Sequence, residues 1–238
     1  MYLSDMHFHL DGYPNHGQIY NQINECKQYT LCVTNSPDIY EACLSTYKET
    51  QFVRFALGMH PLQKMTEGMI DKFQRFAKKA RYIGEVGLDF SKASATMQER
   101  QMNVFSSCLS LAGEGNIFSI HSLRAEKQVY EILKFQNRAN KYIMHWYCGD
   151  IDTLVKLAAL GCYFSINIKQ LTNNQDIVRA MPRERILIES DAPSGSNLGK
   201  KFMPKDLSVL YDRISCFLGI DAVNQINSNM RFLLGKGD

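Results

Sequence analysis

The sequence predicts a single-domain (β/α)₈ TIM barrel that spans residues 1–238. Eight short apolar runs of strand length recur along the whole chain, and segments with helical periodicity alternate with them. The chain also lacks the Pro-rich, Gly/Ser-rich or low-complexity stretch that usually separates two domains. These observations together favour one closed α/β domain.

The expected strands are rich in Ile, Val, Leu, Phe or Tyr, as parallel strands buried on both faces are. In chain order they are Tyr2–His9, Thr30–Thr34, Phe52–Met59, Tyr82–Val86, Ile117–His121, Tyr142–Trp146, Cys162–Ile168 and Ile186–Glu189. Because helical segments separate them, we expect the strands to be parallel and neighbours in this order.

The clearest helix is predicted over Gln98–Ala112, where apolar residues recur at three- and four-residue spacing. Ile151–Ala159 repeats this pattern, with Asp150 or Asp152 as its N-cap. Gly68–Arg81 begins apolar and ends basic, which complements the negative end of a helix dipole. Helix ends are expected at Gly113, Gly161 and Gly219.

A doubly wound open sheet is the alternative architecture. It would normally carry a glycine-rich phosphate loop after its first strand. Here the first strand ends in His7-Phe8-His9-Leu10-Asp11-Gly12 instead, so the barrel ranks ahead.

The bulk composition, with 45% apolar and 21% charged residues, is ordinary for a soluble globular protein. The net charge of +3 neither requires nor excludes a polyanionic partner. No apolar stretch approaches the roughly 18 residues of a membrane span, and Met1–Leu10 does not resemble a signal peptide. The seven cysteines include no CxxC pair. We therefore expect free thiols and a cytoplasmic protein.

Metal-binding side chains fall at the C-terminal ends of the predicted strands, where TIM barrels carry their active sites. There are six of them: His7, His9, Glu85, His121, His145 and Asp191. Taken singly, each has an ordinary explanation, because a bare His-x-His pair is common and a lone strand histidine is more often a satisfied core residue. Their shared position at the strand ends favours a metal site.

The chemistry of this set suits a hydrolase. His7 and His9 point to the same face, because side chains alternate along a strand. Glu85 is costly in an apolar strand unless it is paired or metal-bound, and Asp191 could accept a proton from an attacking water. Imidazole and carboxylate ligands suit Zn²⁺, Mn²⁺ or Fe²⁺ better than Mg²⁺. We expect two divalent ions, with Zn²⁺, Mn²⁺ and Mg²⁺ all still open.

The same residues, in the same order, resemble the TatD family of metal-dependent deoxyribonucleases. The resemblance runs from residue 5 to about residue 234. It rests on Asp5-x-His7-x-His9-Leu10, Gly58-Met59-His60-Pro61, Gly84-Glu85-Val86-Gly87-Leu88-Asp89, Ile120-His121-Ser122, His145, Glu189-Ser190-Asp191-Ala192-Pro193 and Asn229-Met230-Arg231-Phe232-Leu233. Each motif is short, but their combination in one order is highly specific.

The resemblance implies a barrel that cleaves DNA phosphodiester bonds, often from a 3′ end. It implies His7 and His9 at a first metal, His121 and His145 at a second, and Glu85 between the two. Asp191 is implied as ligand and proton acceptor, and Glu85 and Asp191 are thus the expected catalytic carboxylates. His60 is implied near the substrate phosphate.

The chain departs from the family pattern beside three of these residues. Trp146-Tyr147-Cys148-Gly149 replaces the usual Cys-Phe-Ser-Gly, Leu123-Arg124-Ala125 replaces Arg-Asp-Ala, and Ala192-Pro193-Ser194 replaces Ser-Pro-Tyr. All implied metal ligands are kept, so the departures concern substrate and polarity. Leu10-Asp11-Gly12-Tyr13-Pro14 and the compact length also resemble the TatD-like component of the Qat anti-phage defence system, which implies protein partners from that system.

The expected substrate is single-stranded DNA or a frayed end, and the expected substrate-binding residues are His60, Arg124, Trp146, Tyr147 and Lys201. The cations would contact phosphates, and the aromatic residues would stack on bases. Two alternatives remain open. The same metals could polarise a carbonyl in an amidohydrolase or aminoacyl-tRNA deacylase, or the chain could be a defence subunit that binds nucleic acid or partners with little activity alone.

Overall fold

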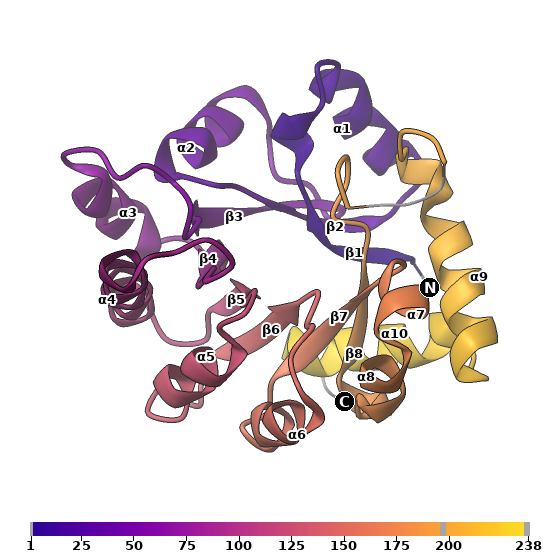
Figure 1. Cartoon of the computed structure of the whole chain (residues 1–238). Helices are drawn as coiled ribbons and strands as arrows, with labels where there is room; N and C mark the ends of the chain where they lie inside the picture. Colours follow the sequence, from indigo (N-terminus) through magenta and orange to yellow (C-terminus); the bar gives the residue numbers. More distant parts are fainter. Residues whose placement is uncertain (1, 196–198, 236–238) are drawn as a thin grey trace.

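Eight parallel strands form a sheet in the chain order β1 to β8 in the computed structural model, which describes residues 2–195 and 199–235. Figure 1 shows these strands at the centre of the molecule, with helices around them. The strands are β1 (Ser4–Phe8), β2 (Tyr29–Val33), β3 (Val53–Met59), β4 (Tyr82–Gly87), β5 (Ile117–His121), β6 (Lys141–His145), β7 (Tyr163–Asn167) and β8 (Ile186–Glu189).

The first and last strands close the barrel near the C-terminal end of β1. The backbone N–H of Asp191 donates to the carbonyl of His7 at 2.9 Å, and the N–H of His9 donates to the carbonyl of Ala192 at the same distance. Phe8 and Ala192 form a parallel β-bridge. These bonds join the two chain segments that carry His7, His9 and Asp191, so barrel closure itself brings these side chains together.

Helices fill the connections between strands and continue after β8. They are α1 (His16–Glu25), α2 (Pro37–Thr46), α3 (Met69–Ala77), α4 (Ala95–Leu111), α5 (Glu126–Leu133), α6 (Ile151–Ala159), α7 (Gln170–Asn173), α8 (Gln175–Ala180), α9 (Leu207–Leu218) and α10 (Ala222–Leu233). Short 3₁₀ helices occupy Leu10–Gly12, Arg183–Arg185 and Pro204–Asp206. Helix α10 packs against β8 (Figure 1).

The predicted barrel is confirmed, and each predicted run overlaps one strand, with bounds that differ by a few residues at most. The helix over Ile151–Ala159 has the predicted bounds, and of the two possible caps it is Asp150 that accepts the N–H of Thr153 at 2.7 Å. Helix α4 begins at Ala95, three residues before the predicted Gln98, because Ser94 caps the helix by accepting the N–H of Met97. Helix α3 ends at Ala77, earlier than Arg81.

The core consists of the apolar faces of the helices and the outward-facing strand residues, among them Phe118, Phe164 and Ile188. Inside the barrel, the C-terminal half is polar: Ser119, Ser165 and Glu189 are fully buried there. Within the described ranges, no helix combines the length and apolar character that crossing a bilayer requires.

Candidate metal centre

The six predicted metal-binding residues meet at one end of the barrel. His7 lies in β1 and His9 just after it, Glu85 in β4, and His121 and His145 end β5 and β6. Asp191 follows β8. All except His7 line a cavity of about 630 Å³ at the C-terminal ends of the strands. His7 is fully buried, so it approaches the other donors from inside the barrel.

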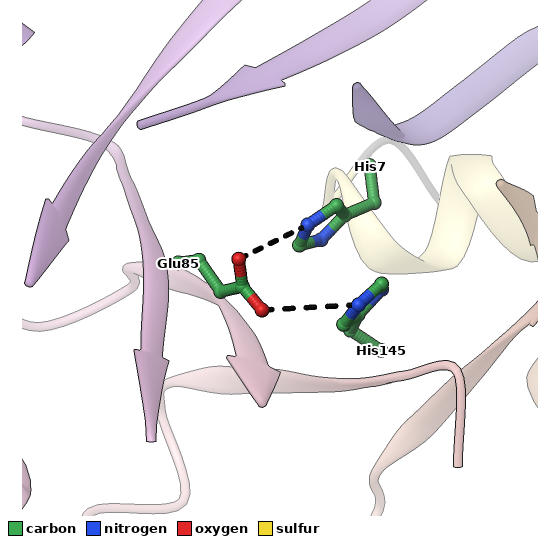
Figure 2. A group of neighbouring side chains, drawn as sticks. All are labelled: His7, Glu85 and His145. Carbon is green, nitrogen blue, oxygen red and sulfur yellow. Dashed lines mark ion pairs between the residues drawn. The ribbon is translucent and has the colours of Figure 1, made fainter. Parts of the chain in front are cut away.

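Glu85 is the centre of this group, as Figure 2 shows with His7 and His145. Its Oε2 lies 3.5 Å from Nε2 of His7, and its Oε1 lies 3.8 Å from Nε2 of His145. The two imidazole rings stack, with centroids 3.6 Å apart. The same Oε1 also lies 2.6 Å from Nδ1 of His121. Glu85 thus presents each oxygen to a different group of histidines.

Four donor atoms on the β1 side are spaced as a metal ion requires. Nε2 of His7 and Nε2 of His9 are 3.3 Å apart, and Oδ1 of Asp191 lies 3.8 and 3.4 Å from them. Oε2 of Glu85 lies 3.6 Å from Nε2 of His9. A tetrahedral zinc-type site with bonds of about 2.0–2.1 Å has ligand separations of about 3.3–3.4 Å. The donors therefore fit a divalent ion with only small adjustments.

Three of the histidines are oriented through their second ring nitrogen. Nδ1 of His7 bonds Oγ of Ser119 at 2.8 Å. Nδ1 of His145 bonds Oε2 of Glu189 at 2.8 Å, and Nε2 of His121 bonds Oδ2 of Asp89 at 3.2 Å. A carboxylate partner at one nitrogen keeps the proton there and leaves the other lone pair free. With an ion bound, these partners would keep the proton at Nε2 of His121 and at Nδ1 of His145, and would leave the other nitrogen of each ring to the metal.

His60 differs from the other histidines in its hydrogen bonding. Its Nδ1 accepts the backbone N–H of Leu62 at 3.1 Å, so the neutral ring carries its proton on Nε2. Burial lowers the pKa of His60, which favours this neutral form. Nε2 lies 3.7 Å from Oε2 of Glu85. His60 is close enough to belong to the group, but it presents an N–H donor to the cavity instead of a lone pair.

Asp191 is placed by a second set of buried bonds. The carboxylate of Asp5 accepts the backbone N–H of Ser190 at 2.9 Å and its Oγ–H at 2.6 Å. Asp5 thereby holds the residue next to Asp191. A Cβ at Gly195 would lie 2.3 Å from Cβ of Asp191, so the close approach of this loop requires glycine.

The carboxylates of the centre are ionised. Burial opposes the ionisation of Glu85, but its interactions with the imidazoles of His7 and His121 hold its pKa well below the usual value. Burial likewise opposes the ionisation of Asp191, and the hydrogen bond from His9 with the charge of His145 lowers its pKa. Burial lowers the pKa of His7 to about 3, mainly by desolvation. The centre therefore offers a cation ionised carboxylates and the neutral imidazole of His7.

Metal binding should release protons and weaken as the pH falls. Burial disfavours the protonated form of both His145 and His121. Nevertheless Glu189 raises the pKa of His145 to about 9, and Glu85 with Asp89 raises the pKa of His121 to about 10. Both rings are thus protonated at neutral pH without an ion, and an ion must displace these protons. We expect release of about two protons at pH 7, measured by calorimetry in buffers of different ionisation enthalpy.

The control for this measurement is His16→Gln, which removes an exposed histidine on α1 and should leave the proton count unchanged. Proton release close to zero in the wild type would contradict the proposed ligation by His121 and His145.

The predicted substrate-binding residues are spread over the rim and the core. His60 and Trp146 line the cavity. Nζ of Lys169 lies 5.2 Å from the centroid of the Trp146 ring. Arg124 is exposed after β5, and Nζ of Lys201 lies 4.6 Å from the centroid of the Tyr13 ring. Neither of these two cations lines the cavity.

Tyr147 corrects one expectation. Its side chain is fully buried, its hydroxyl donates to the carbonyl of Asp150, and its ring packs edge-on against Phe164. A buried ring has no free face, so Tyr147 cannot stack on a base in this structure.

Three orienting residues were not assigned a role from the sequence. Asp89 and Glu189 were seen as parts of motifs, and Ser119 was seen only as part of a strand. Ser119 precedes His121 by two residues, so strand alternation could have indicated that it points inward with that histidine. The partners that Asp89 and Glu189 choose depend on neighbouring strands, which no single motif shows.

Comparison with known proteins agrees with this geometry. The family model described as TatD related DNase matches residues 4–232. A metal-dependent hydrolase from Buchnera aphidicola is 29% identical over 98% of this chain and 99% of its own length. Deoxyribonuclease Tat-D from Schizosaccharomyces pombe is 28% identical over 63% of this chain. The chain spans about half the length of such deoxyribonuclease relatives, 56% of the fission yeast protein and 54% of one from Enterocytozoon bieneusi.

The fold has solved counterparts. The crystal structure of YjjV, a TatD homolog from Escherichia coli, superposes with a TM-score of 0.82 at 20% identity and covers 98% of this chain and 97% of that one. At this identity the likeness concerns the barrel itself.

Proposed function

This chain belongs to the TatD family of metal-dependent hydrolases, and from that membership we propose that it hydrolyses DNA phosphodiester bonds, acting at single-stranded or frayed ends. One observation carries the proposal. The ionised carboxylate of Glu85, which lies at the centre of the proposed cation site, also has the N–H donor of His60 beside it. A phosphate bound to the cations could accept that N–H. The donor at the edge of the site therefore suits an anionic substrate.

The proposed centre holds two divalent ions. His7, His9, Asp191 and Oε2 of Glu85 would hold the first, and His121, His145 and Oε1 of Glu85 the second. Bound ions of this kind supply an activated water and neutralise charge on the phosphate. The mixed nitrogen and oxygen donors favour Zn²⁺ or Mn²⁺ over Mg²⁺.

The protein's own groups have distinct proposed roles. Asp191 is ionised and its side chain is 17% exposed to the cavity, so it can take the proton of an attacking water. His60 donates to the phosphate. Trp146, with Lys169 over its ring, offers a flat surface for a base. Arg124 and Lys201 would meet phosphates farther along the strand.

A substrate panel tests the proposal. Purified protein with Mn²⁺, Zn²⁺ or Mg²⁺ is incubated with end-labelled single-stranded DNA, blunt and frayed duplexes, RNA, aminoacyl-tRNA and small amides. We expect shortening of single-stranded DNA from one end, with slower loss of blunt duplex. Hydrolysis of aminoacyl-tRNA or amides with DNA untouched would contradict the proposal and favour a carbonyl substrate instead.

We further propose that the protein acts in the cytoplasm with partners from an anti-phage defence system. The support is the resemblance of Leu10–Pro14 to the Qat component and the free state of the seven cysteines. Leu10 and Tyr13 are themselves buried, so within this segment a partner could meet only the exposed Asp11, Gly12 and Pro14. Co-purification of partner proteins with the tagged protein, followed by activity assays with and without them, tests this part.

A further inference from the structure

A second, smaller cavity adjoins the metal centre on the far side of His60. It has a volume of about 170 Å³, and its lining includes His60, Leu62, Met65, Met97, Arg100 and Gln101. His60 lines both cavities. The walls come from the segment between β3 and α3 and from the first turns of α4. At about 30 Å³ per water, this volume equals five or six water molecules, which is enough for one planar ring.

Gln101, one of the residues that line this cavity, carries an unused donor. Its Oε1 accepts the backbone N–H of Asp89 at 2.8 Å, which fixes the orientation of the amide. Its Nε2 is buried and has no hydrogen-bond partner among residues 2–195 and 199–235. The side chain as a whole is only 5% exposed. A buried donor without an acceptor is unfavourable, so an acceptor brought by a ligand would satisfy it.

The remaining lining is cationic at the mouth and apolar at the walls. Arg100 and Lys64 are exposed, and no carboxylate occurs among the described residues that line the cavity. Met65, Met97 and Val104 provide polarizable or aliphatic surface. Such a site would select a ligand that has a flat apolar face, an acceptor at the edge of that face and an attached anion. A nucleotide combines these three features.

We propose that this cavity is a subsite for the base of a nucleotide next to the scissile phosphate. A carbonyl oxygen of the base accepts the N–H of Gln101, the methionines contact its faces, and Arg100 binds the adjoining phosphate. The inference rests on the proposed action on DNA. His60 stands between the two cavities, so a strand whose phosphate lies at His60 can send its next base into the smaller one.

The same contacts link the subsite to the metal centre. The residue whose N–H holds Gln101 is Asp89, and the carboxylate of Asp89 bonds His121. Hydrogen bonds therefore connect Gln101 in the subsite, through Asp89, to the proposed metal ligand His121.

The test measures binding of a labelled phosphorothioate pentathymidylate, which resists cleavage, by fluorescence anisotropy. Five further oligonucleotides each carry one abasic residue. In the wild-type protein we expect one abasic position to weaken binding about tenfold, the effect of roughly 1.4 kcal/mol. Arg100→Gln and Gln101→Glu should bind the parent strand more weakly and lose the penalty at that position. Gln101→Glu keeps an acceptor for the backbone N–H of Asp89, removes the donor and adds a negative charge.

The matched control is Arg138→Gln, at an exposed position between α5 and β6, at the opposite end of the barrel. It should keep both the affinity and the abasic penalty. Because Gln101→Glu adds a charge near Asp89, the metal content of this variant is also measured. If the variant holds less metal than the wild type, only the result for Arg100→Gln is used.

Equal binding of the parent and all five abasic strands by wild type, or an undiminished penalty in Arg100→Gln, would overturn the subsite. If wild type cleaves DNA in these cases, the proposed function stands without it. If wild type neither binds nor cleaves DNA, both ideas fail.

Discussion

Asp191→Asn should lower kcat for DNA cleavage about a thousandfold, near the middle of the range for loss of a general base combined with a weakened metal ligand. The amide keeps the size of the side chain and can still accept a hydrogen bond from His9. It cannot take a proton from water, and its neutral oxygen is a weaker ligand. The other carboxylate of the centre, Glu85, is no ready substitute, because it is engaged with five histidines. Initial rates on end-labelled single-stranded DNA, at saturating substrate and metal, measure the effect.

The matched control is Glu126→Gln. Glu126 also lines the cavity, and burial raises its pKa, but it forms none of the contacts among the histidines. Its removal should change kcat only severalfold. If Asp191→Asn kept more than a tenth of the wild-type rate with normal metal content, the assignment of Asp191 as proton acceptor would be wrong.

Glu85→Gln should abolish the stabilisation of the fold by metal. Glu85 offers an oxygen to both proposed ions, so its loss weakens both sites at once. A ligand present at a hundred times its dissociation constant stabilises a protein by about 2.7 kcal/mol. We expect this gain in the wild type and almost none in the variant. Thermal unfolding after chelator treatment, with and without added Mn²⁺ or Zn²⁺, together with metal analysis, gives the measurement.

His60→Gln separates metal binding from substrate binding in the same experiment. Because Nε2 of His60 carries a proton, this variant should keep the metal content and the thermal shift while cleavage falls. Loss of metal in His60→Gln would show that His60 is a ligand and would refute the donor role. Retention of the full thermal shift in Glu85→Gln would contradict the shared carboxylate.

Much of the fold could be predicted because its signals are local. Each strand is an apolar run, and the segments between them have helical periodicity, so alternation along the chain indicated the barrel. The late start predicted for α4 has a local cause as well: apolar periodicity marks the buried face of a helix, whereas its first residue depends on the cap, here Ser94.

The candidate metal centre was also accessible to sequence reasoning, for a topological reason. In a parallel barrel the C-terminal ends of all strands meet at one face, so the position of His121 or His145 within its own strand was enough to indicate a shared site. Tyr147 was misjudged because its neighbour Trp146 does line the cavity. Adjacent residues point in different directions, and the burial of Tyr147 depends on Phe164 in another strand.

By itself the sequence determined which side chains reach the end of the barrel, since strand position and alternation are properties of the chain. Only the tertiary structure decided what each of them does there. The bond from Leu62 makes His60 a donor, Asp89 and Glu189 orient the rings of His121 and His145, and the N–H of Asp89 fixes the orientation of the Gln101 amide. The physical reason is that a hydrogen bond depends on distances of a few tenths of an ångström between atoms from different strands and loops. Such distances exist only once the barrel has closed.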